Sequence, residues 1–200
     1  MSLKTSYHFI APVYDVFLER STSQARRHSL ARLPQQGCLQ VLLNGAGTGL
    51  DFPFLPPCHE YTALDLTGAM LARSLDRGGD LKMTRVQGDG MRLPFADESF
   101  DVAVLHLILA VVPRPELCLA EAARVLKPGG RILLFDKFLR RGQQAWMRRG
   151  LNFFIKHFAT RLDVVFEEVL ETAPGLRVVS DEPALANGWF RLIEIQKDMA

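Results

Sequence analysis

Short apolar runs alternate with longer amphipathic stretches along most of this 200-residue chain. The apolar runs predict strands at Leu39–Leu43, Tyr61–Leu66, Thr84–Gln87, Val102–Leu107, Arg131–Asp136, Leu176–Ser180 and Arg191–Gln196. The fourth of these runs and most of the fifth are apolar throughout, without alternating polar positions. Such runs are typical of strands covered on both faces, as in a parallel sheet with helices on either side.

The most clearly delimited helix follows the fourth predicted strand. It begins near Pro115, a residue that suits the first turn of a helix, and the run Pro128–Gly130 is expected to stop it. Alternation of strands and helices over more than a hundred residues predicts a doubly wound α/β fold with a mostly parallel, seven-stranded sheet. The last two strands are separated by a Pro/Asn/Gly turn and no helix, so we expect an antiparallel pair to finish the sheet.

A turn with three glycines, Gly45, Gly47 and Gly49, directly follows the first predicted strand. Ligands of open parallel sheets bind beyond the carboxyl ends of the strands, and glycine lets a ligand approach the backbone closely. The spacing is not that of the dinucleotide fingerprint G-x-G-x-x-G, because Leu50 stands where its third glycine would be. Taken alone, the turn is as consistent with a structural role as with a ligand site.

Two carboxylates follow the next two predicted strands. Asp65 lies twenty positions after Gly45, where a carboxylate can accept both hydroxyls of a ribose. Asp89 could accept an adenine amino hydrogen, the Gly90 amide could donate to a ring nitrogen, and Met91 could offer its thioether to the ring. Each feature also has a structural interpretation, as a helix cap, a plain turn or a core residue. Together with the glycine turn they predict an adenosine site.

Four motifs, "NGAGTG", "LDLTGAML", "GDGMRLPFADESFDVAV" and "EAARVLKPGGRILLFD", carry a family resemblance by their order and spacing. Residues 41–136 resemble the class I S-adenosylmethionine-dependent methyltransferases, in the type 11 branch that contains the ubiquinone/menaquinone-biosynthesis methyltransferases. The N-terminal "YHFIAPVYD" resembles the opening segment of that branch. The stretches "GTGLDFPFLPP" and "GWFRLIEIQK" are similar to bacterial phosphatidylethanolamine N-methyltransferases.

The resemblance implies S-adenosylmethionine as cofactor and S-adenosylhomocysteine as product. The glycine turn would hold the methionine part, Asp65 the ribose, and Leu66 would lie against the adenine. His106 would lie near the amino-acid end of the cofactor or the transferred methyl group, although packing is the alternative for a lone histidine. The implied cofactor residues are Asn44, Gly45, Ala46, Gly47, Gly49, Asp65, Leu66, Met70, Asp89, Gly90, Met91 and His106.

No catalytic base is evident from the sequence. Transfer of a sulfonium methyl group is an in-line displacement that depends mainly on alignment of the reactants. A carbon or oxygen nucleophile must also lose a proton, whereas an amine has to arrive neutral. In this family the N-terminal segment covers the cofactor, so Tyr7, Tyr14 and His106 are candidates for the acceptor side. Trp146, farther along the chain, is a fourth candidate for contact with the substrate.

The chain is expected to form a single domain with four parts. These are a helical cap over the cofactor (1–36), a cofactor-binding core (37–136), a helical insertion at the substrate site (137–172) and a terminal strand pair (173–200). Residues 137–161 carry seven Lys or Arg, no acid, and interleaved aromatics including Trp146. This segment could be an interfacial helix attracted to an anionic membrane surface. Alternatively, its apolar stripe packs on the sheet beside the substrate pocket.

The bulk composition adds few constraints. The net charge of +2 does not indicate nucleic-acid binding, and no segment approaches the ~20 apolar residues of a membrane span. The N-terminus has no export signal, so we expect a cytoplasmic protein, with peripheral membrane attachment if residues 137–161 bind lipid. Cys38, Cys58 and Cys118 suggest neither a disulfide framework nor a metal site, and buried free thiols are expected.

One position departs from the family pattern. Leu43 stands where members usually carry an acid that orders the glycine loop and receives the cofactor's ammonium group. Asn44 is the neighbouring polar residue, but alternation along a strand would point it to the other face. The departure leaves a second hypothesis open, a degenerate, non-catalytic protein that binds S-adenosylmethionine or adenosine. A nicotinamide-dependent oxidoreductase is disfavoured by Leu50. The acceptor atom and the oligomeric state stay open.

Overall fold

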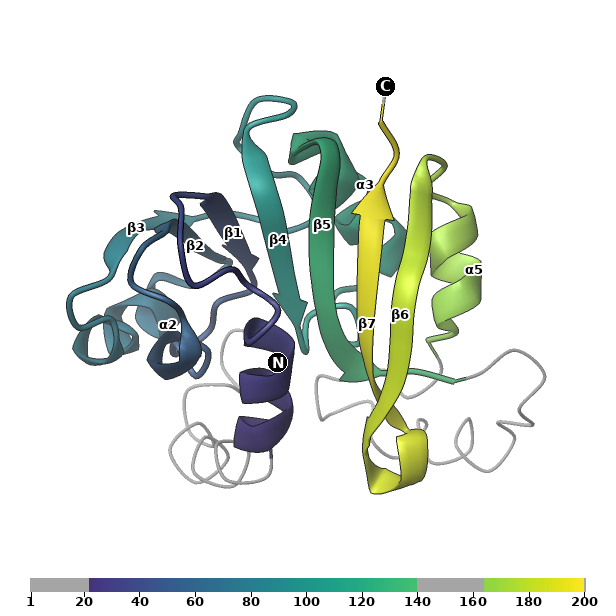
Figure 1. Cartoon of the computed structure of the whole chain (residues 1–200), viewed down its shortest axis with the longest axis horizontal. Coiled ribbons are helices and arrows are strands. Elements are labelled where there is room, and N and C mark those ends of the chain that lie inside the picture. The colour runs from purple at the N-terminus through teal and green to yellow at the C-terminus, as the bar shows by residue number, and fades with distance from the viewer. Residues whose placement is uncertain (1–21, 140–163, 200) are drawn as a thin grey trace.

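One mixed sheet organises the computed structural model of the chain, which describes residues 22–139 and 164–199 (Figure 1). Its strand order is β3-β2-β1-β4-β5-β7-β6. The strands are β1 (Gln40–Asn44), β2 (Glu60–Asp65), β3 (Lys82–Gln87), β4 (Phe100–His106), β5 (Leu126–Lys137), β6 (Leu176–Leu185) and β7 (Phe190–Lys197). Neighbours from β3 to β5 pair in parallel, whereas β7 runs antiparallel to both β5 and β6. The predicted fold class and terminal antiparallel pair are confirmed.

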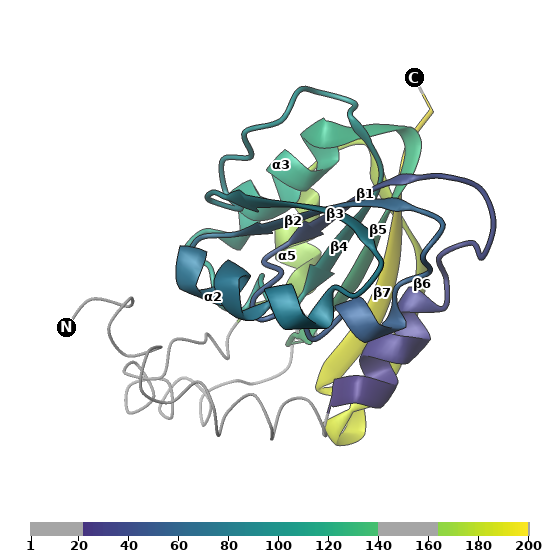
Figure 2. The same ribbon diagram turned by 90° about the vertical axis from the view of Figure 1, so that its left-hand side faces the viewer.

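Helices cover both faces of the sheet. The α-helices are α2 (Gly68–Arg73), α3 (Pro115–Val125), α5 (Phe166–Glu171) and a helix at residues 22–30, and the 3-10 turns are η1 (Phe52–Phe54), η2 (Leu75–Arg77) and η3 (Ala186–Gly188). Figure 2 shows α3 and helix 22–30 on opposite sides of the sheet. Along β1, Leu42 belongs to the apolar cluster under α3 and α5, and Leu43 to the cluster under helix 22–30. This two-sided burial is the reason why the central strands are apolar throughout.

The end of α3 differs from the prediction. The helix ends at Val125, and Leu126 already has extended backbone angles and pairs with Phe100. The α conformation is disfavoured immediately before a proline, so Lys127 could not continue the helix into Pro128. Gly129 has a φ of +75°, and the pairing of β4 with β5 shifts register between Phe100 and Val102. The Pro-Gly-Gly run therefore lies inside an irregular β5 instead of beyond a longer helix.

The N-terminal helix is joined to the C-terminal strands by Arg32. The Arg32 guanidinium donates hydrogen bonds to Ser180 Oγ at 2.9 Å and to Glu182 Oε1 at 3.0 Å, both on β6. It also lies 3.6 Å from a carboxylate oxygen of Glu194 on β7. Helix 22–30 is thereby held against the antiparallel pair as well as against the centre of the sheet.

The prediction of buried thiols is correct for Cys118 and wrong for Cys38. Cys118 is fully buried on α3, whereas Cys38 is exposed and Cys58 is partly buried. Cys38 lies in the loop that leads into β1, where the chain has not yet entered the sheet and its side chain faces solvent. A free thiol therefore need not be a core residue in this chain.

Candidate cofactor and acceptor site

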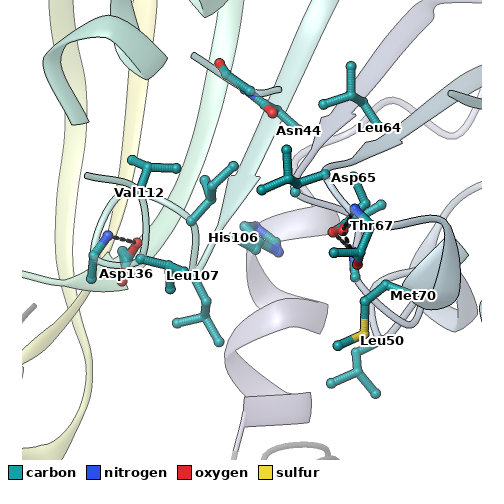
Figure 3. A pocket seen from close by; sticks show the side chains of 18 of the residues that line it. Asn44, Leu50, Leu64, Asp65, Thr67, Met70, His106, Leu107, Val112 and Asp136 are labelled. Carbon is teal, nitrogen blue, oxygen red and sulfur yellow. Dashed lines mark hydrogen bonds between the residues drawn. The ribbon is translucent and has the colours of Figure 1, made fainter. Parts of the chain in front are cut away.

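A cavity of about 380 Å³ lies beyond the carboxyl ends of the five parallel strands (Figure 3). Eleven of the twelve predicted cofactor residues line it: Asn44, Gly45, Ala46, Gly47, Asp65, Leu66, Met70, Asp89, Gly90, Met91 and His106. Segments that are far apart in the sequence thus supply one concave surface. The position is the one expected for a ligand of a doubly wound sheet.

The glycine turn brings backbone to the cavity wall. Gly45 has a φ of +79°, and a Cβ atom there would lie 2.6 Å from Ile108 Cδ1, so a side chain would collide. Gly49, the one predicted cofactor residue that does not line the cavity, has a φ of +83°. A Cβ atom at Gly49 would meet the Phe52 ring at 2.8 Å and Ser74 at 3.1 Å. Gly45 therefore permits close approach at the cavity, and Gly49 permits packing of the turn on the core.

Asp65 holds the glycine turn to the end of β2. Its Oδ2 accepts the Gly47 N–H at 2.9 Å, and its Oδ1 accepts the amide and hydroxyl of Thr67 at 3.0 and 3.1 Å. An ionised carboxylate offers about four lone-pair positions, so acceptor capacity remains on the cavity side. The residue predicted as a ribose ligand therefore also orders the loop.

The wall after β3 is built around Gly90. Asp89 Oδ1 accepts the Met91 N–H at 2.9 Å, and Asn44 Nδ2 donates to the Gly90 carbonyl at 3.3 Å. A Cβ atom at Gly90 would collide with Asn44 Oδ1, so this position needs glycine. Asn44 Oδ1 has almost no accessible surface and no hydrogen-bond partner among the described residues, so it is a buried acceptor packed against Gly90 that costs free energy.

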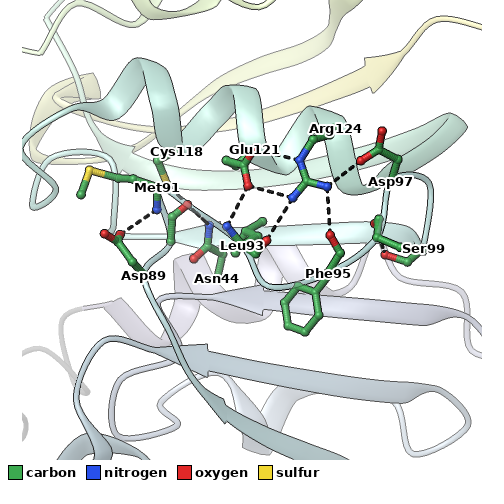
Figure 4. A network of polar contacts seen from close by, with 12 residues as sticks. Asn44, Asp89, Met91, Leu93, Phe95, Asp97, Ser99, Cys118, Glu121 and Arg124 are labelled. Atoms are coloured by element: carbon green, nitrogen blue, oxygen red, sulfur yellow. Dashed lines mark hydrogen bonds and ion pairs between the residues drawn. The ribbon is translucent and has the colours of Figure 1, made fainter.

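The loop after Met91 is fixed to α3 by a polar network (Figure 4). Arg124 donates to both carboxylate oxygens of Glu121 at 2.8 Å and to the carbonyls of Leu93 and Phe95 at 3.0 and 2.9 Å. Glu121 in turn accepts the Leu93 N–H at 2.7 Å. These bonds anchor the loop beside the Gly90 wall without taking part in the cavity.

His106, at the end of β4, belongs to a buried polar cluster that we call the Asp51 cluster, made of Arg26, Ser29, Asp51 and His106. Asp51 Oδ1 lies 2.8 Å from Arg26 Nη1 and 2.7 Å from His106 Nδ1. The second ring nitrogen, His106 Nε2, lies 2.9 Å from Ser29 Oγ. Both ring nitrogens are therefore engaged by protein atoms, and His106 presents no free nitrogen to a substrate.

Charge holds the Asp51 cluster together. Burial by itself would raise the pKa of Asp51, but the Arg26 guanidinium, His106 and their hydrogen bonds outweigh it and hold that pKa well below its usual range. The side chains of Arg26 and Asp51 are only 7% and 8% exposed, so solvent screens the pair little. Because Arg26 lies on helix 22–30 and Asp51 just after the glycine turn, the pair fixes the helix against the loop.

The cavity continues past His106 to the end of β5. Asp136, Lys137, Val112 and Phe190 line this part, and Figure 3 shows Asp136 and Val112 across His106 from Asp65. Leu107, between the two parts, has a φ of 58°, which is unusual for a residue with a branched side chain. The cavity thus has a β1–β3 half, which holds the predicted cofactor residues, and a β4–β5 half.

Comparison with known proteins identifies the family. The profile of the methyltransferase domain family matches residues 42–134. The chain is 30% identical to a phosphatidylethanolamine N-methyltransferase of Cereibacter sphaeroides, over 92% of this chain and 93% of the relative. The chain belongs to the class I S-adenosylmethionine-dependent methyltransferases.

Other relatives of this methyltransferase match less of its length. A ubiquinone/menaquinone biosynthesis C-methyltransferase of Ruegeria sp. is 37% identical over 68% of this chain, which spans only 56% of that relative. Among solved structures, a Bacillus halodurans protein proposed as a methyltransferase has a TM-score of 0.72 at 21% identity, covering 89% of this chain and all of that one. An S-adenosylmethionine-dependent methyltransferase from Mesorhizobium loti has a TM-score of 0.66 at 19% identity, covering 88% and 98%. At such identities the structures bear on the fold alone.

The residues of this methyltransferase fit the cofactor that the family uses. An adenosine needs hydroxyl acceptors, a close backbone approach and an acceptor or donor edge for its base. Asp65 accepts three hydrogen bonds from the described residues and so retains acceptor capacity, and Gly45 and Gly90 bring bare backbone to the wall. The cofactor, S-adenosylmethionine, supplies an activated methyl group on sulfur when bound.

Leu43 does not line the methyltransferase's cavity. It is 2% exposed and packs with Leu30 and Phe52 on the opposite face from Asn44, as strand alternation predicts. The glycine turn is ordered instead by Asp65 and flanked by the Asp51 cluster. Of the Asp51 cluster, sequence reasoning found His106 and missed Arg26, Ser29 and Asp51. Arg26 and Ser29 lie on helix 22–30, which carries no recognisable motif, so spacing gave no signal for their contacts.

Asp136 was also missed, although a signal for it existed. It ends an apolar run, as Asp65 does, and parallel strands bring such ends to one edge of the sheet. The predicted acceptor-side residues Tyr7, Tyr14 and Trp146 lie outside the described residues, as do residues 140–161 of the basic segment. Among the described residues, no helix is long and apolar enough to cross a membrane, and no cluster of metal-binding side chains occurs.

Proposed function

We propose that this methyltransferase transfers the methyl group of S-adenosylmethionine to the amine of a phospholipid headgroup. The observation that carries the proposal is the relative from Cereibacter sphaeroides, whose similarity spans 92% of this chain and 93% of its own length. The C-methyltransferase relative from Ruegeria sp. leaves a third of this chain and 44% of itself unmatched, as its coverages of 68% and 56% show. A match over 92% of the chain extends beyond the cofactor-binding core, and this supports a similar acceptor.

The division of the cavity supports a two-substrate reaction. The β1–β3 half offers Asp65, Asn44 and the glycine turn to the cofactor, and the β4–β5 half offers Asp136, Lys137 and Phe190 to the acceptor. Holding both reactants in one cavity can lower the barrier by roughly 7–11 kcal/mol through alignment. His106 lies between the two halves (Figure 3), and both of its ring nitrogens bond to other members of the Asp51 cluster.

Access to a lipid is the second part of the proposal. We propose that residues 1–36 and 137–172 flank the cavity as cap and insertion, and that the basic segment 137–161 meets an anionic membrane surface on the cytoplasmic side. Its seven positive charges and aromatic side chains have the composition of an interfacial helix. A phosphatidylethanolamine headgroup would then reach the β4–β5 half from the bilayer.

The direct test uses the full chain, methyl-labelled S-adenosylmethionine and vesicles of phosphatidylethanolamine with an anionic lipid. We expect label in monomethylated phosphatidylethanolamine, and none with vesicles in which phosphatidylcholine replaces the amine lipid. Parallel reactions contain a prenylated quinone precursor. Label that enters only this precursor would refute the amine acceptor and favour C-methyl transfer, the activity named for the Ruegeria relative. Calorimetry that detects no S-adenosylmethionine binding would refute methyl transfer altogether.

Membrane attachment is tested separately by co-sedimentation. We expect binding to anionic vesicles that weakens with salt and with the double substitution Arg148→Glu/Arg149→Glu. Neutral phosphatidylcholine vesicles are the control for non-specific adsorption. Equal sedimentation of wild type and double variant would exclude this segment as the contact with lipid.

A further inference from the structure

Three carboxylates from the described residues line the cavity, and each lies at or just after the end of a different strand. Asp89 comes after β3, Asp65 ends β2, and Asp136 lies near the end of β5, with β1 and β4 between the last two. Asp89 and Asp65 belong to the half predicted to bind the adenosine. Among the described residues, Asp136 is the carboxylate of the β4–β5 half. Asp136 borders the space left for the acceptor, and because the residue is 1% exposed, only a small part of it is open to that space.

Asp136 is held in place but is not saturated. Its Oδ2 accepts the Ala110 N–H at 3.0 Å, and its Oδ1 accepts the Lys137 N–H at 2.8 Å. The Leu109 amide also bonds to this carboxylate. Among the described residues, these three donors leave at least one of about four lone-pair positions for a ligand. The Leu109 and Ala110 bonds come from the loop after β4, so the carboxylate is fixed relative to the strand end that carries His106.

Within residues 22–139 and 164–199, no lysine or arginine side chain forms an ion pair with the Asp136 carboxylate. Lys137 is the next residue and lines the same half. Arg191 lies opposite on β7, but its guanidinium is bound to Asp181 and Glu167. On α3 the Cys118 thiol is close enough for the Asp136 charge to contribute to raising its pKa, after burial and Asp89. Val112 and Phe190 complete an apolar rim that suits the carbon chain next to a charged headgroup.

The geometry points to Asp136 as a catalytic carboxylate of this enzyme, one that binds the ammonium group of the acceptor and takes its proton. This role rests on the proposed amine acceptor. The proton moves from nitrogen to an Asp136 oxygen, which leaves a lone pair on nitrogen. That lone pair forms the new N–C bond while the C–S bond of the cofactor breaks and its electrons remain on sulfur. The proton on Asp136 then passes to water.

The titration of Asp136 agrees with this role. Burial raises its pKa to about 6, against the opposing effects of the amide hydrogen bonds and Lys137. The same burial lowers the pKa of Lys137. A base with a pKa near the working pH has both the charge to accept a proton and the capacity to release it. A carboxylate that only anchored a loop would not give the reaction rate an acid limb.

The test compares Asp136→Asn with a matched control, Asp101→Asn. Asp101 also accepts a backbone amide, from Gln40 at 2.8 Å, and also neighbours a lysine, Lys127 at 2.7 Å, but it lies outside the cavity. We expect Asp136→Asn to lower kcat for phosphatidylethanolamine vesicles by about 10²-fold or more. Its S-adenosylmethionine affinity, measured by calorimetry, should stay at the wild-type value. Asp101→Asn should keep the wild-type kcat.

The pH dependence gives a second readout that a structural role would not change. Wild-type kcat/KM should fall below about pH 6 as Asp136 is protonated, and this acid limb should be absent from the residual activity of Asp136→Asn. If Asp136→Asn does not fold, as shown by loss of cofactor binding, Asp136→Glu replaces it and should retain the limb.

The outcomes separate the two proposals. A wild-type kcat in Asp136→Asn, or an acid limb that persists in it, overturns the role of Asp136 and leaves the proposed amine transfer standing. Wild-type enzyme that binds cofactor but transfers nothing to the amine lipid overturns the acceptor, and the role of Asp136 with it.

Discussion

The Asp51 cluster offers the sharpest test of how this methyltransferase holds its cofactor loop. In Asp51→Ala the Arg26 guanidinium, 7% exposed, loses its carboxylate partner, and His106 Nδ1 loses its acceptor. Breaking a buried ion pair from one side costs about 3–5 kcal/mol, because the remaining charge stays buried. At about 2–4 °C per kcal/mol for a chain of this size, Tm should fall by roughly 6–20 °C.

The assay is thermal unfolding for Tm and urea unfolding for the free energy, both at pH 7 and followed by circular dichroism, on wild type and variant. The control is Glu116→Ala, which breaks a pair between Arg114 and Glu116 whose side chains are 63% and 36% exposed. Exposed pairs contribute about 0–1 kcal/mol, so this variant should unfold near the wild-type midpoint. A loss below about 1 kcal/mol in Asp51→Ala would refute the claim that the buried pair fixes helix 22–30 to the loop.

The same comparison has a predicted pH dependence. Because the pKa of Asp51 is lowered in the folded state, its stabilising effect is present above the unfolded value of 3.8 and is lost as pH falls below it. The stability difference between wild type and Asp51→Ala should therefore shrink toward acid pH. A difference that stays constant from pH 7 down to pH 3 would mean that charge is not what stabilises the cluster.

Three further predictions follow from the site. Asp65→Ala should abolish detectable S-adenosylmethionine binding in calorimetry, since it removes both the predicted ribose ligand and the acceptor of the Gly47 amide. Leu43→Asp places a charge in an apolar cluster, so it should lower the unfolding free energy by several kcal/mol instead of tightening cofactor binding. The raised pKa of Asp136 gives stability that is full below pH 3.8 and lost as pH rises through about 6. That gap corresponds to about 3 kcal/mol, and the unfolding free energy of Asp136→Asn should vary less over the same range.

Much of the fold could be predicted because the signals are local. The apolar runs mark all the strands to within a few residues, except that β5 and β6 extend five residues beyond the predicted Arg131 and Ser180. The β5 extension depends on a left-handed Gly129 and a register shift against β4, which are features of pairing. A sequence shows which residues can form a strand, but the irregular pairing at its end depends on the neighbouring strand.

The candidate site also has residues that could be predicted from local sequence and contacts that could not. Gly45, Asp65 and Asp89 could be predicted because each follows a strand, and parallel strands bring those ends together. The contact of Arg26 with Asp51 joins a helix to a loop 25 residues away, and only the packing of that helix on the sheet brings them together. That both ring nitrogens of His106 bond to protein atoms while the residue also lines the cavity could be seen only in the folded structure.

The hydrogen bonds from Arg32 to β6 affect the order in which the protein can fold during its synthesis on the ribosome. Arg32 is 148 residues from Ser180 and 150 from Glu182. At about 5–20 residues per second, a ribosome needs roughly 8–30 s to supply these partners after Arg32 has been added. During that interval the helix that carries Arg26 lacks one of its two anchors. The wall of the cofactor site is therefore expected to reach its final form late in synthesis, after the strands that frame the rest of the site.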